Sequence, residues 1–281
     1  MNPHLYCEQR TAASGSSFYH SFRCLKPAQR RAITALYAFC REVDDAVDDT
    51  DDPIEARDRL DFWRSEINAL DHGAPTHPIS LALQDVRING DSALLQSELL
   101  HEIIDGMEMD LERDRYANFT ELRLYCYRAA SVVGLLAAEI FGYQDRRTLK
   151  YAHDLGMAFQ LTNIIRDVGD DARRGRIYLP QDELARFDVP EAALLAGTPV
   201  PGLAPLMRFQ AQRAQEFYHR AYAQLPDCDR KAQRPGLIMA AIYRTLLGEI
   251  TRADFPVLGE PHQLGRAHKL WIVLVTWLRT R

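Results

Sequence analysis

Residues 33–49 of this 281-residue chain read Ile33-Thr34-Ala35-Leu36-Tyr37-Ala38-Phe39-Cys40-Arg41-Glu42-Val43-Asp44-Asp45-Ala46-Val47-Asp48-Asp49. Apolar side chains recur here every three or four positions, which is the period of an amphipathic α-helix. The segment follows Lys26-Pro27, and proline suits the first position of a helix. The pattern predicts a helix over residues 27–49 that carries an acidic cluster at its carboxyl-terminal end.

Helical geometry separates the aspartates of this cluster. At about 100° per residue, Asp44 and Asp48 fall within roughly 40° of Tyr37, beside the apolar face of the helix. Arg41 lies in the same sector. Asp45 and Asp49 rotate away from Tyr37, by about 80° and 120°, and we expect this pair to face water.

A second acidic cluster lies far along the chain and reads Asn163-Ile164-Ile165-Arg166-Asp167-Val168-Gly169-Asp170-Asp171. Asn163, Asp167 and Asp171 follow one another at intervals of four residues, so they share one face of the helix expected at residues 145–171. Gln160 extends this face by about one turn. Like charges stacked in this way destabilise a helix by about 0.3 kcal/mol unless a cation compensates them.

The two clusters together indicate a metal site. Mg²⁺ in proteins is commonly held by one or two carboxylates, several waters and substrate phosphates. If the clusters face each other across a cavity, they form a site for several Mg²⁺ ions and a diphosphate. A single Asp-x-x-x-Asp pair is usually a solvated helix face, and the acids before Pro53 could simply mark a helix exit. Two clusters, each beside an apolar face and each carrying an arginine, favour the metal site.

Helical periodicity extends over almost the whole chain. Helices are predicted at residues 4–22, 27–49, 53–70, 77–87, 92–110, 119–142, 145–171, 204–224, 235–252 and 260–279. No strand-like alternation persists, and no long polar linker divides the chain. The sequence therefore predicts an all-α fold in a single domain, residues 1–281.

Composition excludes several classes of function. The net charge of −5 arises from intermixed acidic and basic residues, which argues against nucleic-acid binding. The five cysteines have no metal-binding spacing, and the histidines form no zinc motif. With no signal peptide recognised, these features predict a cytoplasmic protein with reduced thiols.

An apolar run near the carboxyl terminus leaves two interpretations open. Residues 270–275 are all apolar, Trp277 and Leu278 follow, and the chain closes with Arg279-Thr280-Arg281. This helix could belong to the core, which we consider the better interpretation. It could instead be an interfacial helix that makes peripheral contact with a membrane through Trp and Arg side chains.

Several segments in this order and spacing resemble the squalene and phytoene synthase family, which joins two prenyl diphosphates head to head. They are Tyr6-Cys7, Ser14-Gly15-Ser16-Ser17-Phe18, Ala35-Leu36-Tyr37-Ala38-Phe39-Cys40-Arg41-Glu42-Val43-Asp44-Asp45, Tyr125-Cys126-Tyr127, Gln160-Leu161-Thr162-Asn163-Ile164-Ile165-Arg166-Asp167 and Arg176-Ile177-Tyr178-Leu179-Pro180. The resemblance covers nearly the whole chain. Residues 104–111 are most similar to bacterial members that make presqualene diphosphate for hopanoids.

The resemblance implies an isoprenoid-synthase-type helical bundle around a large central cavity. It also implies two Mg²⁺-binding faces, expected to hold three ions with the diphosphate: Asp44 and Asp48 on one face, and Asn163, Asp167 and Asp171 on the other. It further implies that other residues contact the diphosphate or line the cavity: Ser17, Phe18, Tyr37, Arg41, Gln160, Arg166, Arg176 and Tyr243. Tyr125 matches a tyrosine implicated in the condensation.

The implied reaction condenses two farnesyl diphosphates to presqualene diphosphate, for which NADPH is not expected. Downstream enzymes of the hopanoid route are implied as partners. The chain departs from the family at Ala129-Ala130-Ser131, where Val-Ala-Gly is usual, and the serine adds a side chain where close helix packing is expected.

Other functions remain open at this point. They are a complete NADPH-dependent squalene synthase, a phytoene synthase acting on geranylgeranyl diphosphate, a terpene cyclase and a non-catalytic assembly protein. The sequence leaves undecided the product, the prenyl chain length, the proton acceptor and the oligomeric state.

Overall fold

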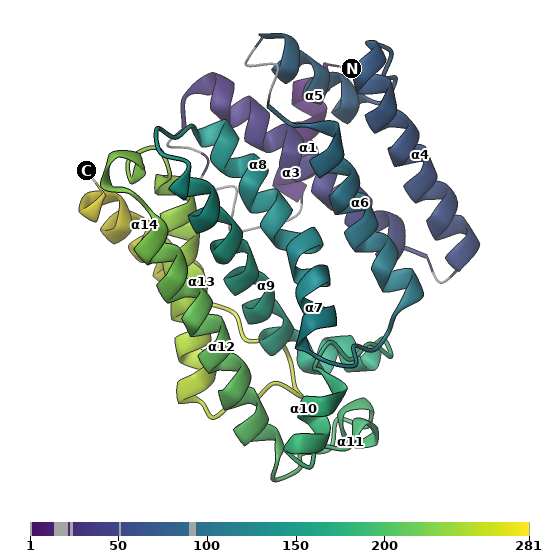
Figure 1. Cartoon of the computed structure of the whole chain (residues 1–281), viewed down its shortest axis with the longest axis vertical. Coiled ribbons are helices and arrows are strands. Elements are labelled where there is room, and N and C mark those ends of the chain that lie inside the picture. Colours follow the sequence, from purple (N-terminus) through teal and green to yellow (C-terminus); the bar gives the residue numbers. More distant parts are fainter. Residues whose placement is uncertain (1, 14–21, 23–24, 51, 90–93, 281) are drawn as a thin grey trace.

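The computed structural model describes residues 2–13, 22, 25–50, 52–89 and 94–280. Within these ranges the regular structure is helical, and an isolated bridge between Arg115 and Ile177 is the only β-type pairing. The prediction of an all-α fold is confirmed (Figure 1). The expectation that residues 1–281 form one domain stays a prediction.

Helix α3 (Pro27–Asp48) lies at the centre of the amino-terminal half (Figure 1). It begins with Pro27 in the first turn, as its sequence predicts. Its neighbours are α1 (Pro3–Ala13), α4 (Pro53–His72), α5 (Pro78–Asn89) and α6 (Ser97–Glu112). Helix α4 is capped at both ends, because Asp52 accepts the Ile54 N–H at 2.9 Å and Gly73 adopts a left-handed φ of 74°.

Helix α9 (Arg147–Arg173) is the corresponding centre of the carboxyl-terminal half. The elements that precede it are α7 (Phe119–Cys126), the π-helical turn η2 (Tyr127–Ser131) and α8 (Val132–Phe141). Those that follow are α10 (Gln181–Arg186), α11 (Glu191–Leu195), α12 (Leu203–Gln224), the 3₁₀ turn η3 (Asp227–Asp229), α13 (Arg234–Arg252) and α14 (Arg266–Arg279). Helices α12 and α13 lie beside α9 (Figure 1).

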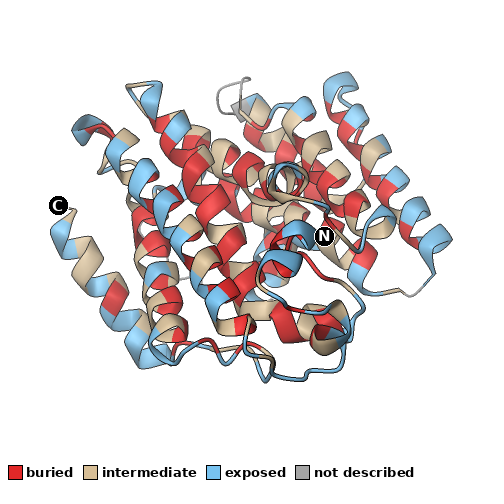
Figure 2. Ribbon diagram, turned by 60° about the horizontal axis from the view of Figure 1, so that its bottom comes forward, coloured by how far each residue is buried: buried red, intermediate tan, exposed pale blue. Residues whose placement is uncertain are grey.

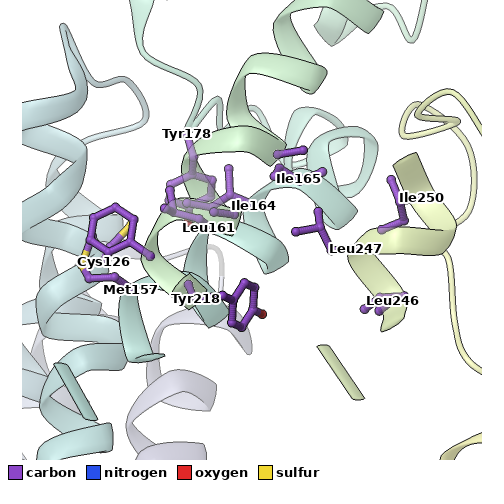
Figure 3. Close-up of a cluster of buried hydrophobic side chains, with 14 of the residues drawn as sticks. Cys126, Met157, Leu161, Ile164, Ile165, Tyr178, Tyr218, Leu246, Leu247 and Ile250 are labelled. Atoms are coloured by element: carbon purple, nitrogen blue, oxygen red, sulfur yellow. The ribbon is translucent and has the colours of Figure 1, made fainter. Parts of the chain in front are cut away.

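Two clusters of buried apolar side chains form the core. One surrounds α9, and Figure 3 shows part of it, with Leu161 and Ile165 of α9 lying between Cys126 of α7 and Leu247 of α13. The other surrounds α3 and includes the first residue of α8, Val132. Because α8 contributes side chains to both clusters, it joins the two halves.

Several predicted boundaries need correction. The helix expected over residues 119–142 is interrupted by η2. Residues 172–203, where no helix was predicted, hold α10 and α11. These two helices have six and five residues, too short to show helical periodicity. The first predicted helix is described as far as Ala13, and residues 14–21 of it lie outside the described residues.

The stretch Phe119–Phe141 is the one helical stretch among the described residues that is long and apolar enough to cross a membrane. Its parts α7, η2 and α8 pack against α6 and α9. Packing in the interior therefore accounts for the apolar character of this stretch.

The carboxyl-terminal helix differs in part from our preferred interpretation. Only Ile272 of α14 is buried, whereas Leu270, Trp271, Leu274 and Leu278 are exposed. In Figure 2 the helix that ends at the C-terminus is mostly exposed or intermediate. The core-helix interpretation therefore holds for the side of α14 that packs on α13 with Ile272 and Val273, and not for the opposite side.

Candidate active site

A cavity of about 330 Å³ lies where the two halves meet, within the size range of small-molecule sites. Its walls come from α3, α6, η2, α8, α9 and α13. Apolar side chains form much of the lining, including Ile33, Leu36, Val133, Leu155, Phe159 and Met239. Polar side chains complete it, namely Tyr37, Arg41, Asp44, Gln160, Asn163 and Tyr243.

The carboxyl-terminal ends of α3 and α9 meet at this cavity. Arg174 Nη1 lies 2.8 Å from Asp48 Oδ2, and Arg176 Nη1 lies 3.1 Å from Asp48 Oδ1. The same arginines also act electrostatically on Asp171. The two acidic clusters thus approach each other with arginines between them. We call this region the acidic mouth: Arg41, Asp44, Asp48, Asn163, Arg166, Asp167, Asp171, Arg174 and Arg176.

The acidic mouth holds as many arginines as aspartates, yet two of its carboxyl groups still have raised pKa values. Partial removal from water, followed by the charge of Asp48, raises the pKa of Asp44 to about 6. Burial, followed by the charges of Asp167 and Asp110, raises the pKa of Asp171 to about 7. An additional cation nearby would stabilise the ionised form of these two carboxyl groups and lower their pKa values.

The donors present fit Mg²⁺ held together with a phosphate ligand. Asn163 Oδ1 is buried without a hydrogen-bond partner, while Asn163 Nδ2 donates to Gln160 Oε1 at 3.3 Å. Within the described ranges, no three acidic, histidine or cysteine side chains gather closely enough to hold a metal by themselves. Oxygen donors that are too few to enclose the ion suit Mg²⁺, which completes its shell with waters and substrate phosphates.

Arg166 and Asp167 form a bidentate pair on α9, with distances of 2.7 Å from Nε to Oδ1 and 2.5 Å from Nη2 to Oδ2. Arg166 also forms a hydrogen bond with the side chain of Tyr243, which lines the cavity from α13. Two of the predicted residues, Ser17 and Phe18, lie outside the described residues.

Tyr125 lies apart from the cavity lining in a separate buried cluster. Its hydroxyl donates to Asp110 Oδ2 at 3.1 Å, and the Tyr178 hydroxyl donates to Asp110 Oδ1 at 2.8 Å. The two tyrosine rings stack with centroids 4.9 Å apart. Burial raises the pKa of both phenols well above the ordinary value and raises the pKa of Asp110 to about 6.

Asp110 and Tyr178 are residues that our sequence reasoning did not select as site residues. Asp110 follows Ile103 and Met107 at helical spacing, so an acid on the apolar face of α6 was the available signal. Arg176 connects this cluster to the acidic mouth, because it bonds Asp48 and acts electrostatically on Asp110.

The prediction that Asp45 and Asp49 face water holds for Asp49, which is exposed, and is wrong for Asp45. Its side chain is 15% exposed, against 43% for Asp44. Asp45 pairs with Arg41 at 2.6 Å and with Arg10 at 3.3 Å. Arg10 belongs to α1, which packs over this side of α3, so a neighbour that the helical pattern cannot show covers Asp45.

The unusual Ser131 is accommodated in a close helix contact. Its hydroxyl donates to the His153 carbonyl of α9 at 2.9 Å. A Cβ added to Gly156 of α9 would lie 2.5 Å from Ser131 Cα, so the absence of a side chain at Gly156 permits the approach. The backbone here is π-helical, and such turns occur frequently at functional sites.

The chain is similar to known proteins over nearly its whole length. The model of the family described as squalene/phytoene synthase matches residues 11–270. The chain is 36% identical to a phytoene synthase from Arthrospira platensis, over 98% of this chain and 92% of the relative. It is 33% identical to a 15-cis-phytoene synthase from Synechocystis sp., over 98% of this chain and 84% of the relative.

Two solved structures share the fold. A dehydrosqualene synthase in complex with ligand superposes with a TM-score of 0.86 at 25% identity, covering 99% of this chain and 97% of that chain. A squalene synthase from Alicyclobacillus acidocaldarius gives a TM-score of 0.79 at 24% identity, covering 92% and 95%.

Proposed function

Because the chain belongs to the squalene/phytoene synthase family, we propose that it condenses two farnesyl diphosphates head to head into presqualene diphosphate. The observation that carries this proposal is the construction of the cavity. An apolar interior able to hold prenyl chains opens beside a mouth where two acidic helix ends face each other. This is the arrangement that a long apolar tail with a diphosphate head requires.

The residues proposed to hold Mg²⁺ are Asp44, Asp48, Asn163, Asp167 and Asp171. Bound there, Mg²⁺ would supply Lewis-acid chemistry that draws charge from a diphosphate and improves it as a leaving group.

The arginines of the acidic mouth have the complementary role. Arg41, Arg166 and Arg176 donate charge-assisted hydrogen bonds to phosphate oxygens. Before substrate binds, they pair with Asp44, Asp167 and Asp48 respectively.

The apolar wall protects the reacting carbons. Loss of one diphosphate leaves an allylic cation, which the double bond of the second substrate attacks. Phe159 and neighbouring apolar side chains exclude water that would quench the cation.

Proton loss then closes the cyclopropane ring. The Tyr125 hydroxyl donates to Asp110, so this pair is one candidate acceptor, with the proton resting on the Asp110 carboxylate. The released diphosphate is the other acceptor.

A second candidate is phytoene synthesis from geranylgeranyl diphosphate, because the relatives named above are phytoene synthases. Farnesyl diphosphate is preferred on the resemblance of residues 104–111 to bacterial enzymes that make presqualene diphosphate. The preferred reaction ends at the cyclopropane and consumes no NADPH.

The test is a product assay read by mass spectrometry. The full chain is incubated with Mg²⁺ and either farnesyl or geranylgeranyl diphosphate, with and without NADPH. We expect presqualene diphosphate from farnesyl diphosphate in both reactions. Squalene formed only with NADPH, or phytoene formed only from the longer substrate, would replace the proposal with the corresponding synthase. No consumption of either substrate would contradict an enzymatic role.

A further inference from the structure

The cavity of the candidate site follows α9 inward from the acidic mouth. Both Asn163 and Tyr151 line this cavity from α9. At 1.5 Å per residue, they lie about 18 Å apart along the helix axis. Tyr151 therefore lies at the end of the cavity that is remote from the acidic mouth, and we call this end the deep end.

Tyr151 separates the deep end from a second cavity. The second cavity has a volume of about 480 Å³, and we call it the arginine cavity because Arg230, Arg244 and Arg279 line it. Arg230 acts electrostatically on the Tyr151 hydroxyl, so this hydroxyl lies between the two cavities. Consecutive residues of α13 face the two sides, because Gly236 lines the first cavity and the next residue lines the second.

The Tyr151 hydroxyl has no hydrogen-bond partner in the described part of the chain, although the residue is only 1% exposed. Burial raises the pKa of this phenol above its ordinary value, so the hydroxyl stays protonated. A buried hydroxyl without a partner costs free energy, and packing alone would therefore favour phenylalanine. The oxygen serves instead as additional volume in the wall between the cavities.

Gly236 makes room for this oxygen. A Cβ added to Gly236 would lie 2.9 Å from the Tyr151 hydroxyl oxygen, which is closer than real side-chain carbons approach. The same Cβ would lie 3.8 Å from Tyr151 Cζ, which is an ordinary van der Waals distance. Tyrosine at position 151 and glycine at position 236 thus fill one space together.

The elements around the deep end are held together. Helix α9 lies beside both α8 and α13 (Figure 1). Gln233 Nε2 donates to the carbonyls of Ala138 at 3.2 Å and Gly142 at 3.0 Å, which joins the start of α13 to the end of α8. The Thr148 hydroxyl donates to Asp229 at 2.6 Å, which joins the start of α9 to the segment before α13. A wall held in this way does not move aside for a longer chain.

We propose that Tyr151, fitted against Gly236, closes the deep end and limits the prenyl chain to the length of farnesyl. This inference rests on the proposed function and specifies the chain length that the same site accepts. A geranylgeranyl chain is one isoprene unit longer, so its end has to pass the Tyr151 ring into the arginine cavity. There it would remove water from guanidinium groups without offering them a hydrogen bond, which is unfavourable.

The test is a competition between two substrates. The full chain receives equal amounts of farnesyl and geranylgeranyl diphosphate with Mg²⁺, and mass spectrometry measures the consumption of each. The unchanged protein should consume mainly the farnesyl substrate. Tyr151→Ala removes the ring from the wall, so the ratio of geranylgeranyl to farnesyl consumption should rise at least about tenfold.

A rearranged wall tests the fit between the two positions. Tyr151→Phe removes only the oxygen, so the consumption ratio should rise by about twofold. Tyr151→Phe with Gly236→Ala places a methyl group where the oxygen was, and the ratio should return to that of the unchanged protein. Gly236→Ala alone sets the methyl group against the oxygen, so it should melt at a lower temperature than the double variant. These conservative changes test the wall even where Tyr151→Ala fails to fold.

Leu206→Ala on α12 is the matched control. Leu206 is 0% exposed and lines neither cavity, so the variant should melt at a lower temperature while its consumption ratio stays unchanged. Binding is measured separately by calorimetry with thiolodiphosphate analogues of the two chain lengths, which bind without reacting. The unchanged protein should bind the farnesyl analogue more tightly, and Tyr151→Ala should lose this preference.

Three results would overturn the inference: equal binding of the two analogues by the unchanged protein, a preference of that protein for the longer substrate, or an unaltered ratio in Tyr151→Ala. Failure of the proposed function would look different. The unchanged protein would then consume neither substrate, while the analogues would still report the chain length that the cavity accepts.

Discussion

The acidic mouth and the arginine cavity, which is lined by Arg230, Arg244 and Arg279, differ in how their charged side chains are paired. In the mouth, arginines bridge the acids, and two carboxyl groups have raised pKa values. In the arginine cavity, the arginines have no acidic partner among the described residues. Most aspartates of the mouth are therefore paired with arginines of the protein, whereas the described residues supply no acid to pair with the arginines of the cavity.

The difference indicates which of the two regions takes part in the proposed reaction. Crowded carboxyl groups with raised pKa values at the end of an apolar cavity favour cations that arrive with a diphosphate. The arginine cavity lies behind Tyr151, on the far side of the wall from the acidic mouth. Each region should respond to changes that leave the other unaffected.

The largest expected effect is the loss of turnover when the mouth loses a carboxylate. Asp44→Asn or Asp167→Asn should reduce turnover by about a thousandfold, because an oxygen of the proposed metal-binding faces loses its charge. Steady-state kinetics with Mg²⁺ measures this, and the melting temperature should change little. Asp58→Asn on α4 is the matched control and should remain active. Full activity in both mouth variants would remove the metal assignment.

The next effect tests whether the cluster of Tyr125 and Asp110, which Arg176 links to the mouth, takes part in the reaction. Tyr125→Phe removes the hydroxyl that donates to Asp110, so turnover should fall by about a hundredfold while KM changes little. Tyr143→Phe removes a hydroxyl bonded to Glu139 at 2.8 Å on another part of the surface and serves as the control. An unchanged kcat in Tyr125→Phe would make the Tyr125 cluster structural.

A smaller effect concerns stability and pH. The pKa of Asp171 is raised from 3.8 to about 7, so ionisation of this group weakens the folded state. Its contribution to stability is fully present below the unfolded-chain value and is lost as pH rises through about 7. Without Mg²⁺ the melting temperature should therefore fall as pH rises from about 5 to about 7 and level off by about pH 8.

Asp171→Asn isolates this contribution. The fall in melting temperature should be smaller by about 2–4 °C in the variant, which corresponds to roughly 1 kcal/mol after solvent screening. Mg²⁺ should stabilise the unchanged protein more at the higher pH. Scanning fluorimetry measures both quantities, and identical pH profiles for the two proteins would contradict the crowding of the mouth.

The smallest expected effect crosses the two regions. Arg279 is exposed, lines the arginine cavity and makes no ion pair with the described residues. Arg279→Gln protein should turn over farnesyl diphosphate within about twofold of the unchanged protein in steady-state kinetics, because exposed charges are screened by salt. A larger change would show that the arginine cavity contributes to the reaction, and the two regions would no longer be independent.

The sequence predicted helices well where they are long and amphipathic. Helix α3 begins at the predicted Pro27, and α9 carries Asn163, Asp167 and Asp171 on the predicted helix. Short helices and backbone irregularities were not predictable. The turn η2 depends on the contact of Ser131 with Gly156, and these residues are distant in sequence.

The candidate site also has one part that the sequence predicts and another that it does not. The residues that line the cavity from α3 and α9 follow from helical spacing alone. The bond from Tyr125 to Asp110, the arginine bridge to Asp48 and the covering of Asp45 by Arg10 do not. Each of these contacts joins two elements whose relative position depends on packing.

The sequence by itself determined the helical class, the two acidic faces and the family resemblance, because these depend on residue types at fixed local spacing. Only the tertiary structure decided which acids are crowded, where Tyr125 lies and that α14 turns its apolar stripe outward. A stripe of apolar residues looks the same in sequence whether a neighbouring helix covers it or not. Whether it is covered depends on the packing of distant elements, and at α14 this packing buries Ile272 and leaves Leu270, Trp271, Leu274 and Leu278 exposed.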